Sequence, residues 1–450
     1  MNDGQRPPGP KGGRFLGSLP AFRNDPLGFF MESTSTWGDV VHLKLGSKDT
    51  VLIRHPDDVR RVLQRNHKNY SKRTRGVKKL QRMLGRGLLT TDGDEWLRQR
   101  RISQPAFHRK RIQHFADVMV RDSLDLADTW EGRTDDEVVD IAEEMMLLTL
   151  KIASQTLFST NVQEQADALS ESMTFCMKTF NRSFSRAIDL PQWVPSPENL
   201  GMRRHRGRID RIVRELITER RSGEGEHGDL LAMLIEARDE ETGEALTEEN
   251  LVDGVLTMLI AGHETTANAL AWTWQLLGDN PEAEAKVRAE VDEVLEGRLA
   301  TLEDLPRLTY TTMVIHEALR LRPPGWFFGR TAEADDELGG FPIPAGWLVI
   351  MSPYATHRHP EFWPEPERFL PERHSPEATE ARRPFAYFPF SGGPRNCIGS
   401  NFAMMEMQLV VATLIQRVQL EPAWTGPIGE EPLVTLRPEG GVPMRIRKPA

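Results

Sequence analysis

The sequence predicts a mainly α-helical fold with a smaller β region, in one domain that spans residues 1–450. Apolar residues recur at helical spacing over most of residues 95–277, whereas short strand-like runs lie near the N-terminus and after Pro323 and Pro324. No linker rich in proline, serine, glycine or charge divides the chain, although its length alone would allow about three domains. The hydrophobic content of 39% and the charged content of 27% are those of a globular protein.

Local signals set the order of the elements. Two short apolar runs flank a Gly-Ser-Lys-Asp turn and indicate a strand pair, and Thr247 with two glutamates begins an unusually long helix. Residues 353–394 are expected to form a long proline-rich meander with little regular structure, and such a segment is usually functional. In chain order we expect strands at 40–45 and 50–53; mainly helix over 95–277, with breaks near 132 and at 191–197, 222–228 and 239–243; helices over 247–280, 281–296 and 309–321; strand-like pieces after 324; the meander over 353–394; a helix over 401–417; and short C-terminal strands.

Charge and cysteine content exclude several classes of protein. The net charge of −9 argues against nucleic acid as a partner, and two cysteines cannot form a disulfide framework, so a reducing compartment is expected. The N-terminus lacks the apolar core of a signal peptide, and the most apolar stretch, residues 255–274, contains His263 and Glu264. We therefore expect a cytoplasmic protein without a membrane anchor. The Gly-x-Gly-x-x-Gly run at 223–228 follows no strand and carries two glutamates, so it does not indicate a nucleotide site.

Cys397 is the first candidate for chemistry. Glycine and proline make the backbone before it turn-like, and a helix-like stretch begins just after it. A sulfur at a helix N-terminus is biased toward the thiolate form. With no second cysteine near it, such a thiolate is either a nucleophile or a single axial metal ligand. The other cysteine, Cys176, lies in an apolar helix-like stretch and is most simply a buried small hydrophobe.

A second candidate is the pair Glu317 and Arg320, three residues apart on one helix face with mostly apolar neighbours. A buried ion pair needs further partners to offset its desolvation, and Arg368 in the Pro-Glu-Arg-Phe run is the expected third member. His357 and His359 could suggest a metal, but no third ligand is close in sequence, which favours a structural loop.

Two more groups stand out on predicted helices. Glu264 and Thr265 place an acid and an alcohol in the middle of the long apolar helix, where they are costly to bury without a function. A threonine there can also bond to the carbonyl four residues earlier and bend the helix. Trp96 and Arg100 are pure hydrogen-bond donors four residues apart, which suits an anionic group such as a carboxylate. The alternative to an anion-binding role is that the pair belongs to a solvated basic helix face on which the one tryptophan is partly buried.

Together and in this order, these features resemble the cytochrome P-450 family of heme-thiolate proteins. The resemblance rests on five motifs that span residues 96–399. They are Trp-x-x-x-Arg at Trp96 and Arg100, Ala-Gly-x-Glu-Thr at Ala261 to Thr265, Glu-x-x-Arg at Glu317 and Arg320, Pro-Glu-Arg-Phe at Pro366 to Phe369, and Phe-x-x-Gly-x-Arg-x-Cys-x-Gly at Phe390, Gly393, Arg395, Cys397 and Gly399.

The resemblance implies a triangular, mostly helical single domain, with heme b between the long central helix and the helix after the cysteine. Cys397 would be the axial thiolate ligand of the iron. Glu317, Arg320 and Arg368 would form a structural triad. The implied cofactor-binding residues are Trp96, Arg100, Arg330, Phe390, Arg395 and Cys397.

The implied activity is that of a monooxygenase, which inserts one oxygen atom of O2 into a hydrophobic substrate. Glu264 and Thr265 would deliver the protons that oxygen activation needs. Family members that use peroxide commonly lack this acid–alcohol pair, so it favours dependence on O2 and electrons. A peroxide-using peroxygenase and a non-catalytic heme- or ligand-binding sensor stay open as alternatives.

The expected partners follow from the same resemblance. Only residues 398–450 follow the cysteine, so no fused reductase is expected, and electrons would come from a separate ferredoxin or flavodoxin and its reductase. A monomer is expected. Basic residues would attract the electron donor, unless they form only a solvated face; they are Arg98, Arg101, Arg109, Lys110 and Arg111.

The substrate pocket is expected to be apolar, which suits a fatty acid, terpenoid or steroid. Residues 326–328 could equally serve as core packing. Phe184 belongs to a segment that forms a mobile lid in relatives. The candidate pocket residues are Leu259, Ile260, Ala261, Trp326, Phe327, Phe328 and Thr435.

Overall fold

The computed structural model describes residues 6–134, 136–158, 171–179, 182, 193–222 and 229–447. Phe184 and the glycine-rich run at 223–228 lie outside these residues. The chain divides into two compact units. Unit 1 comprises residues 1–75, 313–397 and 430–437, and unit 2 comprises residues 76–312, 398–429 and 438–450.

Unit 1 is built on a five-stranded sheet with the strand order β1-β2-β8-β5-β3. Its neighbouring strands are antiparallel, except that β2 and β8 are parallel. Gly46, with a φ of 64°, turns the chain between β1 and β2, at the place where the sequence predicts a turn. The strands are β1 (Val40–Leu45), β2 (Lys48–Ile53), β8 (Leu348–Met351), β5 (Phe328–Ala332) and β3 (Tyr70–Ser71).

Apolar clusters cover both faces of this sheet. Successive side chains of a strand point to opposite faces, so Val51 and Ile53 join one cluster and Leu52 joins the other. Short helices and strands complete the unit, and α14 begins in unit 2 and continues into unit 1. These elements are α1 (Leu19–Asn24), α2 (Pro26–Trp37), α3 (Pro56–Arg60), η2 (Arg61–Arg65), η3 (His67–Asn69), α14 (Thr309–Leu321), β6 (Asp336–Leu338), β7 (Phe341–Ile343), α15 (Pro353–Thr356), η7 (Pro371–His374), α16 (Pro376–Ala381), η8 (Gly393–Arg395), β10 (Glu430–Pro432) and β11 (Leu436–Pro438).

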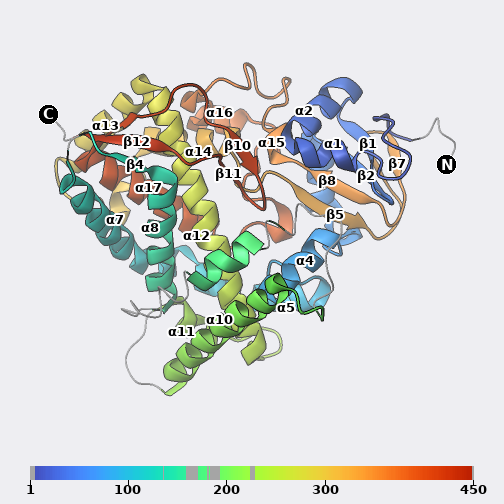
Figure 1. Ribbon diagram of the computed structural model, residues 1–450, viewed down its shortest axis with the longest axis horizontal. Helices are drawn as coiled ribbons and strands as arrows, with labels where there is room; N and C mark the ends of the chain where they lie inside the picture. The colour runs from blue at the N-terminus through green and yellow to red at the C-terminus, as the bar shows by residue number, and fades with distance from the viewer. Residues whose placement is uncertain are drawn as a thin grey trace. The chain divides into compact units, whose positions relative to one another are not determined.

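Unit 2 is helical around α12 (Glu248–Asp279), which packs mainly against α8 and also contacts α17 (Figure 1). Thr247 caps the start of α12 by accepting a hydrogen bond from the backbone of Asn250 at 3.1 Å, and the helix ends just before Pro281, as the sequence predicts. The other elements of unit 2 are α4 (Arg75–Leu84), α5 (Gly93–Ser103), η4 (Gln104–Phe107), α6 (Arg109–Ile112), η5 (Gln113–Phe115), α7 (Ala116–Glu131), β4 (Val138–Asp140), α8 (Ile141–Phe158), α10 (Pro197–Ser222), α11 (Leu230–Glu236), α13 (Pro281–Leu295), η6 (Leu302–Asp304), α17 (Ser400–Arg417), β9 (Gln419–Pro422) and β12 (Pro443–Arg447).

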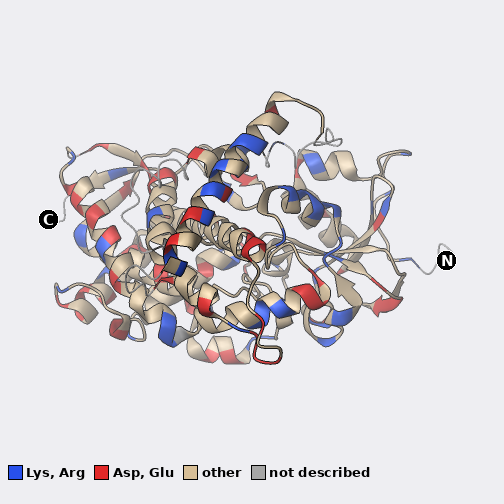
Figure 2. Ribbon diagram, turned by 90° about the horizontal axis from the view of Figure 1, so that it is seen from below, with Lys and Arg blue, Asp and Glu red and all other residues tan. Residues whose placement is uncertain are grey.

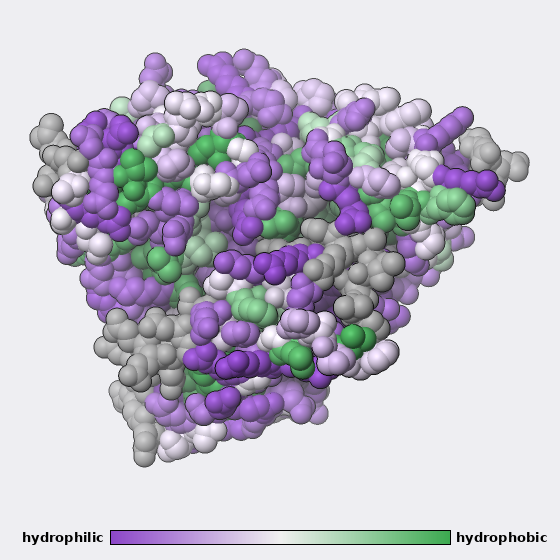
Figure 3. All heavy atoms as spheres, viewed as in Figure 1, coloured by the Kyte–Doolittle hydropathy of each residue, from purple (hydrophilic) through white to green (hydrophobic). Residues whose placement is uncertain are grey.

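The surface is mixed in character. Basic and acidic residues are interspersed along the ribbon rather than separated (Figure 2), and hydrophobic residues form small groups among hydrophilic ones on the face seen in Figure 3. Among the described residues, no helix has the length and apolar content that a membrane crossing requires.

Candidate functional site

The loop that ends at Cys397 is tight and closed by backbone hydrogen bonds. The Cys397 N–H donates to the Phe390 carbonyl at 2.9 Å, and Gly393 has a φ of 66°. A Cβ on Gly393 would lie 1.9 Å from the carbonyl oxygen of Leu63, so both the conformation and the space require glycine. The Cys397 side chain is exposed, whereas Cys176 is buried, and burial raises the pKa of the Cys176 thiol to about 11. Cys397 therefore presents an exposed thiol on a fixed loop of unit 1.

Three of the other predicted cofactor-binding residues, Arg330, Phe390 and Arg395, belong to the same unit as Cys397. Arg395 and Phe390 are half-buried in the cysteine loop itself. Arg330 lies on β5, is 5% exposed, and its guanidinium donates to the Gly329 carbonyl at 2.9 Å. The guanidinium of an arginine carries only N–H donors, a chemistry that suits an anion.

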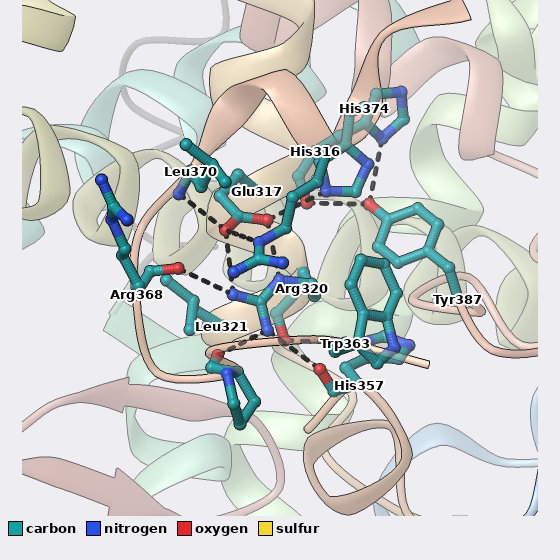
Figure 4. A network of polar contacts seen from close by, with 12 residues as sticks. His316, Glu317, Arg320, Leu321, His357, Trp363, Arg368, Leu370, His374 and Tyr387 are labelled. Atoms are coloured by element: carbon teal, nitrogen blue, oxygen red, sulfur yellow. Dashed lines mark hydrogen bonds and ion pairs between the residues drawn. The ribbon is translucent and has the colours of Figure 1, made fainter. Parts of the chain in front are cut away.

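The predicted ion pair on α14 is present, and it is fully buried (Figure 4). Arg320 donates through Nε and Nη2 to the two carboxylate oxygens of Glu317, at 2.7 and 2.9 Å. Burial acts to raise the pKa of Glu317, but the hydrogen bonds from Arg320 and His374 outweigh it, so the pKa is lowered. The remaining Arg320 donors reach three backbone carbonyls of the meander, those of His357 (2.9 Å), Pro366 (2.7 Å) and Arg368 (3.2 Å).

The prediction that the Arg368 side chain completes the triad is wrong. That side chain is 61% exposed and lies 3.3 Å from the exposed carboxylate of Glu365, so only the Arg368 backbone takes part. The buried partners of Glu317 are instead His374, whose Nε2 lies 3.1 Å from Oε2, and Arg373, whose Nε lies 3.5 Å from Oε1. A second Pro-Glu-Arg run, five residues after the first, is the signal in the sequence that could have identified them.

In the middle of α12, side chains bond to several backbone carbonyls. Thr265 and Thr266 donate to the carbonyls four residues earlier, at 2.6 and 2.8 Å, as the sequence predicts. Sequence reasoning missed two more such contacts, which come from His263 to the Leu259 carbonyl and from Thr149 on α8 to the His263 carbonyl, both at 3.1 Å. Glu264 is 7% exposed, whereas Thr265 is half-exposed.

The donor pair on α5 is half-buried. Trp96 and Arg100 both lie on this helix, and Arg100 Nε also donates to Gln104 at 3.3 Å. The neighbouring cations are less available than the sequence suggests, because Arg98 pairs with Glu244 at 3.1 Å and Arg101 pairs with the buried Asp239 at 3.0 Å.

The candidate pocket residues have different environments. Leu259, Ile260 and Thr435 are buried and Ala261 is exposed, whereas Phe327 and Phe328 are half-buried against the apolar clusters of unit 1. Trp326 is 1% exposed, contacts the ring of Phe30, and donates its indole N–H to the Leu433 carbonyl at 3.0 Å. The structure therefore places Trp326 in the core of unit 1, which favours core packing over a pocket wall for this residue.

The two histidines considered as metal ligands are structural. His357 bonds to backbone groups of residues 320 and 388, and His359 pairs with Asp39 at 3.1 Å. Among the described residues, no group of three or more histidine, cysteine or carboxylate side chains could hold a metal ion.

The comparisons with known proteins agree with this geometry. The family model described as cytochrome P450 matches residues 7–442. The chain belongs to the cytochrome P450 family. Heme b is therefore its cofactor, and its activity is that of a P450 monooxygenase. The predicted fold class, mainly α with a smaller β region, is confirmed.

Named relatives and a solved structure refine the position in the family. The chain is 39% identical to a cyclooctat-9-en-7-ol 5-monooxygenase of Streptomyces melanosporofaciens, over 90% of this chain and 88% of that protein. It is 34% identical to a pentalenene oxygenase of Streptomyces avermitilis, over 87% of each chain. The crystal structure of a cytochrome P450DA heme domain superimposes with a TM-score of 0.90 at 28% identity, covering 99% of this chain and 98% of the other.

Proposed function

We propose that this P450 hydroxylates a terpenoid, using O2 and electrons from a separate donor protein. The observation that supports the substrate class most directly is the similarity to two bacterial relatives whose names specify cyclooctat-9-en-7-ol and pentalenene, which are terpenoids. The apolar side chains of Ile260 and the exposed Ala261 fit a hydrocarbon-rich substrate, whereas Leu259 is fully buried.

Cys397 is the proposed axial ligand of the heme iron. It is the exposed cysteine on a loop held by the Phe390 carbonyl and by the required glycine at 393. When bound, heme with a thiolate ligand supplies the capacity to activate O2. Arg330 and Arg395 on unit 1, and Trp96 and Arg100 on unit 2, have the donor chemistry that carboxylate groups of a heme require. The role of these four residues rests on the resemblance and on that chemistry.

Glu264 and Thr265 are the proposed proton-delivery groups. The Thr265 hydroxyl donates to the Ala261 carbonyl at 2.6 Å, so its lone pairs stay available to accept a hydrogen bond. It can therefore hold a proton donor in place, while the neighbouring Glu264 carboxyl exchanges protons. Thr266 offers a matched control, because it makes the same bond to the Gly262 carbonyl but is 2% exposed. We expect Thr265→Ala to lower the product formed per electron several-fold and Thr266→Ala to leave it unchanged.

The electron donor is proposed to be a ferredoxin or flavodoxin with its reductase. Because Arg98 and Arg101 already pair with acidic residues of this chain, their contribution to an attractive surface is reduced. Lys110 and Arg111 remain as candidate contacts for an acidic partner. We expect the reduction rate to fall as ionic strength rises.

The proposed function is tested by turnover of the heme-containing protein with a ferredoxin, its reductase and isotopically labelled O2. The substrates are a panel of cyclic diterpenes and sesquiterpenes, with a fatty acid and a steroid as the comparison. We expect hydroxylated product from a terpenoid, with the new oxygen carrying the label. Product that forms only when peroxide is added would identify a peroxygenase instead, and absence of product from every terpenoid would contradict the substrate class.

A further inference from the structure

Asp253, near the start of α12, is a carboxylate that belongs to none of the five motifs. Its Oδ2 accepts a hydrogen bond from the backbone N–H of Arg86 at 2.7 Å, and its Oδ1 accepts from Nη2 of Arg206 at 2.6 Å. Arg206 lies on α10, which contacts α12 and crosses it in Figure 1. Arg86 lies in the loop between α4 and α5, residues 85–92, called here the α4–α5 loop. One side chain of α12 therefore holds both a second helix and a loop.

The α4–α5 loop has a backbone shaped for close contact with α12. Gly85 has a φ of 69°, and a Cβ on it would lie 2.0 Å from Oδ1 of Asp253. Both the conformation and the space at this position therefore require glycine. A Cβ on Gly87 would collide with the hydroxyl of Thr257, one turn further along α12. The loop thus follows α12 over successive turns.

Hydrogen bonds within the α4–α5 loop and to the helices beside it make it one stiff unit. The Thr90 hydroxyl donates to the Gly85 carbonyl at 2.6 Å. Gln81 of α4 donates to the Thr90 carbonyl at 2.8 Å, and Gln99 of α5 donates to the Arg86 carbonyl at 2.9 Å. Because the loop is bonded in this way, a contact that fixes it at Arg86 fixes the rest of it as well.

The face of α12 that meets the loop leads to the proposed pocket. Ile260 and Glu264 follow Asp253 by seven and eleven residues, a spacing that puts all three on one face of a helix. Ile260 is a candidate pocket residue, and Glu264 is a proposed proton-delivery group. The loop itself carries Leu89, whose apolar side chain is exposed. The α4–α5 loop is therefore placed to add an apolar wall next to the pocket residues of α12.

Arg206 connects the same contact to α10. Its Nη1 donates to the Met83 carbonyl at the end of α4, and its Nε donates to Oδ1 of Asp210 at 2.7 Å. Asp210 and Asp253 are thus both carboxylate partners of one guanidinium. Asp210 lies on α10 itself, whereas Asp253 also accepts from the α4–α5 loop. This difference gives a matched pair of acidic residues for an experiment.

We propose that Asp253 is a positioning residue for substrate specificity, which holds the α4–α5 loop on α12 as one wall of the substrate pocket. This inference rests on the proposed function, in which Ile260 and Ala261 face the substrate. Removing the carboxylate takes away the acceptor of the Arg86 N–H and one partner of Arg206, so the loop gains freedom. A ligand that packs on the loop must then order it, and this lowers the affinity for that ligand.

The first test measures the loop directly, in the full chain with heme. Asp253→Ala and Gly85→Ala disturb the same contact from its two sides. Their controls are Asp210→Asn, which removes the other carboxylate partner of Arg206, and Gly93→Ala, where φ is 61° but nothing lies within 4 Å of the new carbon. The readout is amide hydrogen exchange in the peptide that contains Arg86, followed by mass spectrometry.

We expect this exchange to be several-fold faster in Asp253→Ala than in wild type and in Asp210→Asn. Exchange in Gly85→Ala should also exceed that in Gly93→Ala, which reports the backbone strain without the collision. Wild-type exchange in Asp253→Ala would overturn the proposal. If that variant fails to fold, equal exchange in Gly85→Ala and Gly93→Ala would overturn it instead.

The second test measures specificity with two ligands of ferric heme, imidazole and the larger, apolar phenylimidazole. Their dissociation constants are read from the shift of the Soret band. In Asp253→Ala we expect phenylimidazole to bind several-fold more weakly and imidazole to bind as in wild type, with both affinities unchanged in Asp210→Asn. Faster loop exchange with an unchanged ratio of the two constants would overturn the specificity role. Absence of terpenoid product from wild type would contradict the proposed function, and both tests would still decide the role of Asp253.

Discussion

Replacing Arg320 by methionine should be among the most destabilising single changes in unit 1. Arg320 makes two hydrogen bonds to Glu317 and three to backbone carbonyls, and both members of the ion pair have fully buried side chains. Removing one partner of a buried pair costs about 3–5 kcal/mol. Each carbonyl left without a donor adds about 1 kcal/mol or more. Arg373 and His374 still face Glu317 and limit the loss, so we expect about 4 kcal/mol.

The matched control is Arg368→Met, five residues before Arg373. Among the described residues, the Arg368 side chain pairs only with the exposed Glu365, so the expected loss is below about 1 kcal/mol. Urea unfolding curves followed by circular dichroism, with heme retention measured in parallel, compare the two variants. A loss from Arg368→Met equal to that from Arg320→Met would refute the assignment of Arg368 to the surface and of Arg373 and His374 to the buried network.

Three further predictions follow from the same structure. Gly393→Ala should lower the fraction of protein that retains heme, because the new methyl group would collide with the Leu63 carbonyl; Gly254→Ala, where nothing lies within 4 Å of the new carbon, is the control. Acidification should destabilise the fold below about pH 6.5, because burial lowers the pKa of His263, His316 and His374 to about 4, 3 and 4, so the unfolded chain binds more protons. The slope should reach about 1.4 kcal/mol per pH unit for each histidine, and pH-independent unfolding from pH 6.5 to 4 would contradict this. Glu244→Gln removes the acidic partner of Arg98, so it should increase the salt dependence of the reduction rate measured by stopped flow; an unchanged salt dependence would contradict this.

Local signals predicted much of the secondary structure. The helix expected over residues 309–321 is α14, and Thr247 caps α12 as its position suggested. The expected strands at 40–45 and 50–53 correspond to β1 and β2. These elements depend on residues that are close in sequence, such as caps, turns and apolar spacing, and so they are readable without a structure.

Contacts between distant residues were less predictable. The exact match to the Pro-Glu-Arg-Phe motif favoured Arg368 as the third member of the buried network. The chain turns, however, so that the arginine of the next Pro-Glu-Arg run lies beside Glu317. The basic residues Arg98 and Arg101 looked free because their acidic partners lie more than 130 residues later. For Trp326 the sequence allowed either a pocket wall or core packing, and its indole belongs to a core cluster with Phe30. Burial and nonlocal pairing decided all three cases.

The central claim is that Cys397 provides the thiolate ligand of the heme. The most direct measurement is the absorption spectrum of the reduced carbon monoxide adduct of wild type, Cys397→Ser and Cys176→Ser. The account predicts the strongly red-shifted Soret band of a thiolate ligand in wild type and in Cys176→Ser, because the Cys176 thiol is buried in unit 2. It predicts loss of that band in Cys397→Ser. Retention of the band in folded, heme-containing Cys397→Ser would contradict the claim.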